Sequence, residues 1–160
     1  MERKVGRASI IMNKLAKILC FAWLVLTACD NNGSEIEQDT MPLPSPFNFF
    51  INLDLPAAQS LQFENHLYLP DYGLRGLVVV KLENGYVTYD RICPVSPDDE
   101  CSQVNFINAG TTNSYLQCKC GEAFYRARDG FPTNSPEPRK LREYYTEYSG
   151  NTLYIESTIR

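Results

Sequence analysis

The sequence predicts an all-β domain built from small antiparallel sheets, and three observations support this. Short runs rich in Val, Ile, Phe and Tyr recur through residues 47–157, with Gly, Pro and Asn turn signals between them. No window has the 3.6-residue apolar stripe of an amphipathic helix. Two cysteine-bearing segments, 90–94 and 117–124, each follow a strand-like run. Many short strands are typical of a sandwich or a barrel-like fold.

Residues 1–28 are predicted to be a lipoprotein signal peptide. Five basic residues precede or border the apolar run 18–28, which is shorter than the ~20 residues of a membrane-spanning helix. The run ends in Leu26-Thr27-Ala28-Cys29, which looks like a bacterial lipobox, so Cys29 is the predicted site of lipidation, with palmitate among its acyl chains. A transmembrane anchor and a plain signal peptide cleaved near Ala28 are the alternatives. Translation from Met1 or from Met12 fits this interpretation.

The charge balance limits the partners of the mature chain. The whole chain carries −4, and residues 1–28 carry five basic residues and one acid, so the remainder carries −8. Such an acidic chain does not suit nucleic acid, whose phosphates require Lys and Arg, and it has no basic patch for anionic lipids. We therefore expect the lipid to be the membrane contact, with the protein at the outer membrane, the cell surface or in the periplasm.

Residues 29–46 are predicted to be an acidic, proline-rich tether. Its acids are not balanced by any basic residue, and three prolines follow them. The residues concerned are Asp30, Glu35, Glu37, Asp39, Pro42, Pro44 and Pro46. A segment of this composition cannot bury enough apolar surface to fold. It resembles the surface-export signals of Bacteroidetes lipoproteins, and an ordinary solvated spacer is the alternative. Residues 47–160 then form one domain.

The strands are predicted in chain order as follows. Residues 47–53 alternate apolar and polar side chains, with Phe50 as the exception, and the run ends before Pro56. The segment 61–69 is mixed, and 76–82 is apolar enough for a central strand. Asn84-Gly85 predicts a hairpin turn with positive φ at both positions, leading into a strand over 86–90.

Further strands are predicted beyond the first cysteines. Runs at 104–107 and 115–117 form one pair, with the polar segment 108–113 between them. A strand at 124–125 precedes the Asp129-Gly130 turn, and runs at 141–148 and 152–156 flank a hairpin turn at 149–151.

Four of the six cysteines belong to the predicted domain, because Cys20 lies in the signal and Cys29 is assigned to lipid. They are Cys93, Cys101, Cys118 and Cys120. Four cysteines allow three pairings. A bridge from Cys118 to Cys120 would close a very small ring and is disfavoured, which leaves two pairings. An exported location favours disulfides over free thiols.

The arrangement resembles the Rieske domain. The shared features are the hairpin strand before Asp90-Arg91-Ile92-Cys93-Pro94, a second cysteine at 101, and Cys118-Lys119-Cys120-Gly121 followed by Phe124 and Asp129-Gly130. Residues 134–138 resemble the proline loop of that family. The resemblance covers roughly residues 47–157 and is strongest to the divergent Rieske-like lipoproteins of Bacteroidetes. It implies a Rieske-like fold with two cysteine-bearing loops.

The resemblance does not extend to the cluster ligands. A Rieske [2Fe–2S] cluster is held by two cysteines and two histidines. Val95 stands where the first loop of the family has histidine, Cys120 stands before Gly121 where the second has histidine, and Gln117 takes the place of the outer cysteine ligand. His66 is the single histidine of the chain and lies outside both loops, so the standard cluster is excluded.

The resemblance also implies a disulfide pairing. Cys101 and Cys118 approximate the family's disulfide, and Cys93 and Cys120 would then form a second one in place of the cluster. The main expectation is therefore no cofactor. The first alternative is a metal site of all four cysteines, holding zinc or a [2Fe–2S] or other cluster. The second is thiol–disulfide chemistry at Cys118 and Cys120, where Lys119 would favour a thiolate.

Other candidate sites are weaker. Asp98-Asp99-Glu100 would suit a cation, although a solvated loop tip is the simpler interpretation. Neither a Ser-His-Asp set, a phosphate loop nor a His-Glu metal motif occurs in the sequence, so an enzyme is not favoured. We expect a non-enzymatic binding or assembly module with an unknown protein partner. The alternative is an electron-transfer protein with a non-standard, cysteine-ligated centre.

Overall fold

The computed structural model describes residues 41–108, 114–134 and 139–160. The predicted signal peptide, Cys29, both possible start residues and most of the tether lie outside these residues, as do positions 135–138 of the predicted proline loop. Within the tether, Met41 is buried, and the backbone carbonyls of Met41 and Pro42 accept hydrogen bonds from Arg142. Among the described residues, no helix is both long enough and apolar enough to cross a membrane.

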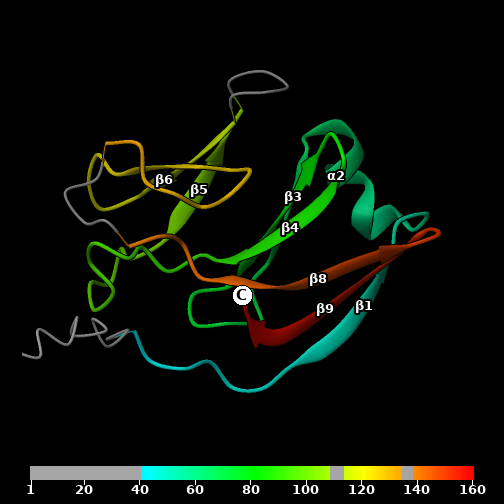
Figure 1. The fold of residues 1–160 in the computed structure, drawn as a ribbon, viewed down its shortest axis with the longest axis horizontal. Coiled ribbons are helices and arrows are strands. Elements are labelled where there is room, and N and C mark those ends of the chain that lie inside the picture. The colour runs from blue at the N-terminus through cyan, green and yellow to red at the C-terminus, as the bar shows by residue number, and fades with distance from the viewer. Residues whose placement is uncertain (1–40, 109–113, 135–138) are drawn as a thin grey trace, which may run out of the picture. The chain divides into compact units, whose positions relative to one another are not determined.

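In the described part of the chain, nine strands form two antiparallel sheets (Figure 1). The large sheet has the order β1-β9-β8-β4-β3-β2, and the small sheet has the order β5-β6-β7. The large sheet comprises β1 (Asn48–Asn52), β2 (His66–Leu69), β3 (Leu77–Leu82), β4 (Gly85–Asp90), β8 (Glu143–Ser149) and β9 (Thr152–Ile159). The small sheet comprises β5 (Val104–Ile107), β6 (Tyr115–Cys118) and β7 (Phe124–Arg126). The predicted all-β class is confirmed.

Strand β3 has no polar residue in its first half because both of its faces are covered. Val78 and Val80 face the small sheet, where they join Phe106, Leu116 and Tyr125 in one hydrophobic core. The alternate residues of β3 join a second core on the opposite face of the strand. That second core contains Leu77, Val79, Leu61, Tyr144, Leu153 and Ile155. A strand that is buried on both faces has a continuous apolar run, as this one does.

The mixed segment before β2 contains two short helical turns that the sequence does not predict. A 3-10 turn, η1 (Pro56–Ala58), leads into α2 (Gln59–Phe63), which packs against β2 and β3 (Figure 1). The two turns are too short to show a repeating apolar stripe, and Ala58 and Leu61 alone bury their side chains. In segments this short, hydrophobic periodicity cannot distinguish a helical turn from a loop.

The predicted β3–β4 hairpin is confirmed, but its turn lies one residue earlier than expected. Leu82 pairs with Gly85, so the loop is Glu83-Asn84, and Gly85 already belongs to β4. Gly85 has φ of 133°, whereas Asn84 does not have positive φ. The expectation of positive φ at both Asn84 and Gly85 was therefore wrong.

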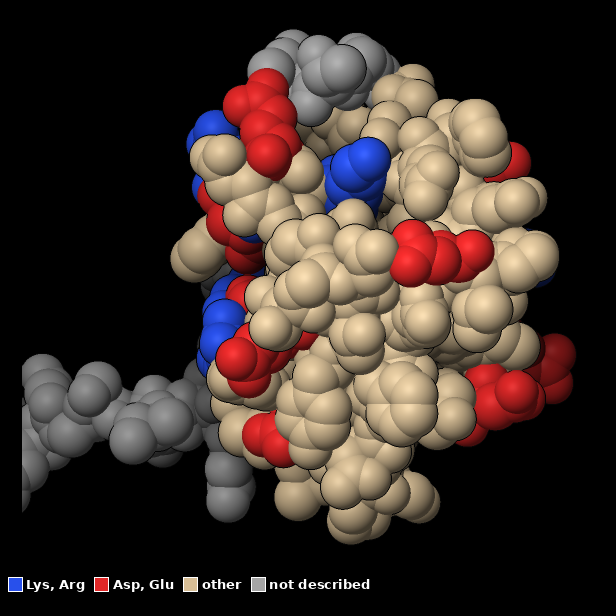
Figure 2. All heavy atoms as spheres, turned by 90° about the vertical axis from the view of Figure 1, so that its right-hand side faces the viewer, with Lys and Arg blue, Asp and Glu red and all other residues tan. Residues whose placement is uncertain are grey.

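One side of the domain has few charged side chains. The elements on the right-hand side of Figure 1 include α2, β1 and the turn between β8 and β9, and the view from that side is largely uncharged (Figure 2). Large apolar side chains are exposed on or near these elements: Phe50 on β1, Leu55 between β1 and η1, Phe63 on α2 and Tyr148 on β8. Phe50 and Tyr148 lie on opposite faces of the large sheet, because Phe50 is opposite Tyr154 and Tyr148 is opposite Leu153. We call this side of the domain, with these four side chains, the apolar face.

Candidate functional site

Cys93, Cys101 and Cys120 lie on two loops at the same end of the small sheet, and Cys118 is the last residue of the strand that leads into the second loop. The first cysteine loop, residues 91–103, connects β4 to β5, and the second, residues 119–123, connects β6 to β7. Val104 and Cys118 are cross-strand partners at the end of the β5–β6 ladder. Beyond that pair, the Lys119 N–H donates to the Gln103 carbonyl at 2.8 Å, so the loops continue side by side.

The first loop is fixed at its start by the buried carboxylate of Asp90, the last residue of β4. Its Oδ2 accepts hydrogen bonds from Leu74 N–H and from the Tyr144 hydroxyl, both at 2.8 Å. Its Oδ1 accepts from Ile92 N–H at 2.9 Å and from Arg75 N–H at 3.3 Å. Four donors match the four acceptor positions of a carboxylate. Burial and the neighbouring Asp90 raise the pKa of Tyr144, which keeps its hydroxyl a donor.

Arg91, the first residue of the loop, joins the two sheets. Its guanidinium lies 4.0 Å from the ring centroid of Tyr68 on β2 and donates to Val104 and Asn105 on β5. Burial lowers the pKa of Arg91, and the electrostatic interaction with Tyr68 opposes this shift. The Tyr68 hydroxyl in turn accepts a hydrogen bond from Phe106 N–H at 2.8 Å. A cation over an aromatic face stabilises such a contact by about 1 kcal/mol.

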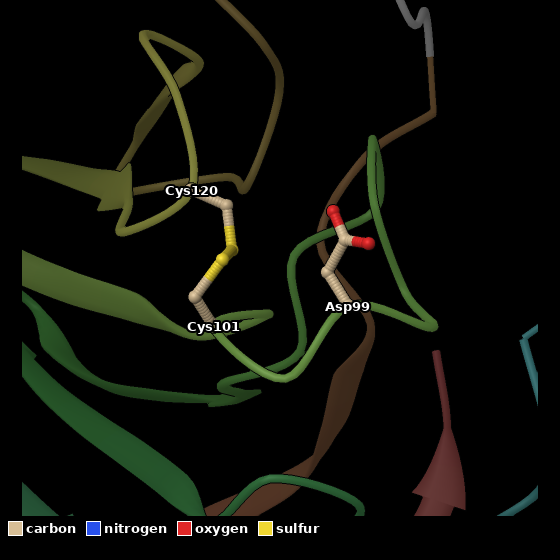
Figure 3. Close-up of side chains that lie close together, drawn as sticks. All are labelled: Asp99, Cys101 and Cys120. Atoms are coloured by element: carbon tan, nitrogen blue, oxygen red, sulfur yellow. A yellow bond between two sulfur atoms is a disulfide. The ribbon is translucent and has the colours of Figure 1, made fainter.

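The first disulfide joins Cys101 to Cys120 at the outside of the loops (Figure 3). Their Cα atoms are 5.5 Å apart. Cys101 is exposed and Cys120 is half-buried. Asp99, on the same loop as Cys101, places a carboxylate oxygen near both sulfurs, with the three atoms within 4.8 Å of one another.

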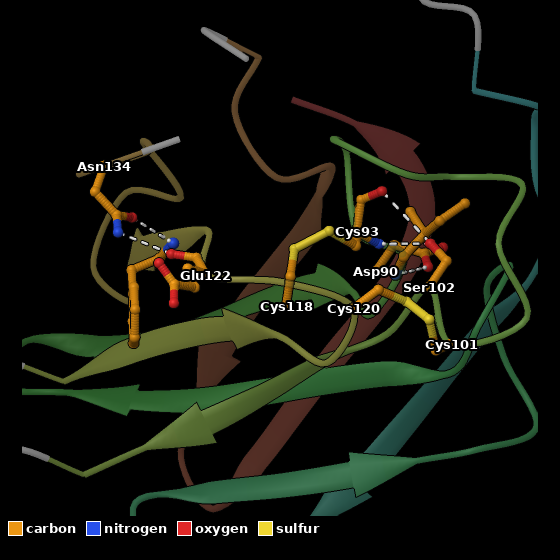
Figure 4. Close-up of a disulfide and its surroundings, with 10 residues drawn as sticks. Asp90, Cys93, Cys101, Ser102, Cys118, Cys120, Glu122 and Asn134 are labelled. Atoms are coloured by element: carbon orange, nitrogen blue, oxygen red, sulfur yellow. Dashed lines mark hydrogen bonds between the residues drawn. A yellow bond between two sulfur atoms is a disulfide. The ribbon is translucent and has the colours of Figure 1, made fainter. Parts of the chain in front are cut away.

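The second disulfide joins Cys93 to Cys118 inside the domain (Figure 4). Both residues are at most 1% exposed and belong to the core between the two sheets, and Val95 packs against that core. Ser102, also buried, accepts a hydrogen bond from Cys93 N–H at 3.1 Å and donates to the Cys93 carbonyl at 3.4 Å. This disulfide is therefore part of the packed interior.

The predicted pairing was wrong, although the four cysteines do form two disulfides. The resemblance implied Cys93–Cys120 and Cys101–Cys118, and the structure has the other of the two pairings that the residues left open. The reason is the register of β5 and β6. Extended past Val104 and Cys118, it brings residue 120 beside residues 101–102, while Cys118 points into the core toward Cys93.

Asn134, at the start of the predicted proline loop, holds the second loop in shape. Its side chain accepts a hydrogen bond from Phe124 N–H and donates to the Glu122 carbonyl, both at 2.8 Å (Figure 4). Gly121 has φ of 131°, which favours glycine at this turn. Neither Asn134 nor Ser102 stood out as a support of the site in the sequence, because single polar residues in loops have no distinguishing pattern.

The remaining predicted positions lie apart from this arrangement or contribute no ligand. Gln117 lies within β6, opposite Asn105 and Phe124. His66, on β2, stacks on Phe106 with ring centroids 4.7 Å apart, and its Nδ1 lies 3.1 Å from the Glu64 carbonyl oxygen. The donor set of the loops, four cysteines without a histidine, does not fit a cluster that needs two histidine ligands.

Comparisons with known proteins give structural neighbours of low sequence identity. No protein-family model and no curated protein matches the chain. One solved structure, a complex of reduced oxygenase and oxidised ferredoxin in carbazole 1,9a-dioxygenase, aligns with a TM-score of 0.47 and 14% identity, covering 69% of this chain and 95% of that chain. The ferredoxin of carbazole 1,9a-dioxygenase from Nocardioides aromaticivorans aligns with a TM-score of 0.44 and 14% identity, covering 71% and 97%. These likenesses concern the fold alone.

The antiparallel sheets and the two cysteine-bearing loops that the sequence predicts are present. A small three-stranded sheet packs on a larger antiparallel sheet, and two cysteine-bearing loops are joined at its end.

The Asp90→Asn substitution should lower the free energy of unfolding by about 3 kcal/mol. In the wild type all four donors face carboxylate oxygens, whereas in the variant an NH₂ group replaces one of these oxygens and cannot accept their hydrogen bonds. Urea denaturation at neutral pH measures the change. The matched control is Asp98→Asn on the exposed part of the first loop, which should shift stability by less than about 0.5 kcal/mol. Equal effects of the two substitutions would contradict the role assigned to Asp90.

The two disulfides should differ in their contribution to stability. Their sequence separations of 25 and 19 residues are similar, so loop closure stabilises the fold by about 3 kcal/mol in each case. The double variant Cys93→Ala/Cys118→Ala should lose more than this, because it also removes packed sulfur atoms from the core. Cys101→Ala/Cys120→Ala should lose about 3 kcal/mol or less.

Denaturation curves of the two double variants test this order, and a larger loss in Cys101→Ala/Cys120→Ala would refute it. Non-reduced peptide mapping tests the pairing itself. Cleavage after Glu100, Phe106 and Lys119 separates all four cysteines. The linked peptides should contain Cys93 with Cys118 and Cys101 with Cys120, and no others.

Proposed function

We propose that the chain is a lipid-anchored cell-envelope protein whose Rieske-like domain acts as a binding or assembly module stabilised by two disulfides. In this proposal Cys29 bears the lipid, residues 29–46 form the tether, and the domain carries no standard cluster. In this proposal the location is the outer membrane, the cell surface or the periplasm, and no enzymatic activity is assigned to the domain.

The observation that carries the proposal is the use of all four domain cysteines in disulfides. Disulfides persist in oxidising compartments, which agrees with export. The same two bonds occupy the thiols that a cysteine-ligated metal would need. A zinc or iron–sulfur centre held by all four cysteines would require both disulfides to open, including the one inside the core.

A binding role is supported by the apolar face. Phe50 and Phe63 are 73% and 79% exposed, and Leu55 and Tyr148 on neighbouring elements are also exposed. Large exposed apolar side chains on a surface with few charges are typical of protein interaction sites. Because the contact is apolar, the partner does not need a surface whose charge is opposite to that of this chain.

Lipid anchoring and the absence of a cluster can be tested on the full chain expressed in its native host. The protein should partition into the detergent phase of Triton X-114, and Cys29→Ser should move it to the aqueous phase, because acyl chains supply the membrane affinity. The purified protein should be colourless and contain much less than one iron per chain. A brown protein with iron and labile sulfide would replace the proposal with the electron-transfer alternative.

The binding role can be tested with the apolar face. Chemical cross-linking of the full chain in native envelopes should give a discrete adduct that Phe50→Ser/Phe63→Ser weakens at least tenfold, because removal of each ring loses about 2 kcal/mol of buried apolar contact. Phe131→Ser is the matched control, since Phe131 is 48% exposed and follows the small sheet. Loss of the adduct in Phe131→Ser alone would contradict this assignment of the interface.

A further inference from the structure

The two disulfides differ in their accessibility to a thiol. Thiol–disulfide exchange requires the attacking thiolate to reach a sulfur atom, so the rate depends on access. Cys93 and Cys118 are at most 1% exposed and lie within the core between the sheets. Cys101 is exposed and Cys120 is half-buried, on the outside of the loops. An external dithiol therefore reaches Cys101–Cys120 and not Cys93–Cys118.

The loops around Cys101 and Cys120 are held by other contacts that do not depend on the outer disulfide. The Lys119 N–H, next to Cys120 in the chain, donates at 2.8 Å to the carbonyl of Gln103, two residues after Cys101. Ser102, which follows Cys101, is buried and hydrogen-bonded to Cys93, whose disulfide lies in the core. After reduction, the thiols of Cys101 and Cys120 thus remain near each other.

Asp99 lies beside the outer disulfide. Its carboxylate is a possible third metal ligand, in addition to the two thiols that reduction would release. Its carboxylate accepts no hydrogen bond and forms no ion pair within the described residues, yet its backbone is fixed on both sides. Asp99 N–H donates to the Ser96 carbonyl, and the Asp99 carbonyl accepts from Ser102 N–H at 2.9 Å and from Arg75 at 3.1 Å. One carboxylate oxygen and the two sulfurs lie within 4.8 Å of one another.

We propose that Cys101–Cys120 is a thiol–disulfide exchange site, and that its dithiol form binds Zn²⁺ together with Asp99. Two thiolates and a carboxylate are zinc ligands, and three protein ligands leave the fourth tetrahedral position for water or another ligand. The site differs from one of four cysteines, because Cys93 and Cys118 stay bonded to each other. The inference rests on the outer disulfide and Asp99, and not on lipidation or on the apolar face.

The exchange balances with a partner dithiol, such as dithiothreitol or a dithiol protein, as reductant. A thiolate of the dithiol attacks one sulfur, which breaks the Cys101–Cys120 bond, forms a mixed disulfide and releases the other cysteine as a thiolate. The second thiol of the partner then attacks the partner's own sulfur in the mixed disulfide. This releases the remaining protein cysteine as a thiolate and the partner as an internal disulfide. Two electrons and two protons pass to Cys101 and Cys120, and Zn²⁺ binding then displaces the two protons.

Selective reduction is tested on the full chain in detergent by titration with dithiothreitol, alkylation with iodoacetamide and peptide mapping. Cys101 and Cys120 should be alkylated while Cys93 and Cys118 remain linked, over at least a tenfold range of dithiothreitol concentration. Reduction of both disulfides together, or of Cys93–Cys118 first, would overturn the proposal.

Metal binding is tested on the selectively reduced protein after anaerobic removal of dithiothreitol. Titration with Zn²⁺ should give one ion per chain, and Co²⁺ should give the absorption of a thiolate-to-metal charge-transfer band. The oxidised protein should give neither, and neither should Cys101→Ser/Cys120→Ser. A reduced wild-type protein that binds no Zn²⁺, or a Cys101→Ser/Cys120→Ser variant that does, would overturn the metal site.

The role of Asp99 has a charge-matched control in its neighbour Asp98, which is exposed on the same loop. Asp99→Ala should weaken Zn²⁺ binding at least tenfold without changing the dithiothreitol concentration for reduction. Asp98→Ala removes the same charge and should leave the affinity within about threefold. Equal weakening by both substitutions would show that Asp99 acts through charge alone and would overturn its assignment as a ligand.

Discussion

The buried carboxylate of Asp90 is the interaction on which the arrangement of the two sheets depends. It lies where β4 ends and the chain leaves the large sheet for the small one, and its four donors come from three separate segments. Gly73 allows this close packing, because a Cβ at that position would lie 2.7 Å from Asp90 Oδ2. A buried carboxylate is costly unless its acceptor positions are filled. Filling them requires the 73–75 turn, the start of the first cysteine loop and β8 to meet at one point.

From this point the geometry of the cysteines follows in steps. Asp90 fixes Ile92, and Arg91 is held against Tyr68 and β5, so the first loop must turn back over the end of the small sheet. The turn places Cys93 inside, under Ser102, where Cys118 at the end of β6 faces it. The rest of the loop passes outside, and Cys101 meets Cys120 there. One loop thus supplies an inner and an outer cysteine.

Local sequence patterns predicted most of the strands and the two cysteine-bearing loops, because these features are encoded by neighbouring residues. The run 77–80 is apolar on both faces, and the hairpins have their turn residues in place. The helical turns η1 and α2 were missed, since eight residues with two buried side chains show no period. The role of Asp90 was also not predictable, because its donors Leu74 and Tyr144 are 16 and 54 residues away.

The disulfide pairing shows where a family resemblance and strand register lead to different answers. The resemblance matched Cys101 and Cys118 to the family's disulfide by their positions along the sequence alone. The pairing of β5 with β6 instead determines which side chains point into the core. Once Val104 is opposite Cys118, continuing the register places residue 120 opposite residue 102, and therefore next to Cys101. Had that register been known, Cys120 would have been expected beside Cys101, and Cys93 and Cys118 would have been left to pair with each other. The inner bond is then determined by packing and the outer bond by proximity at the surface, which is why chemistry with an external partner belongs to the outer pair.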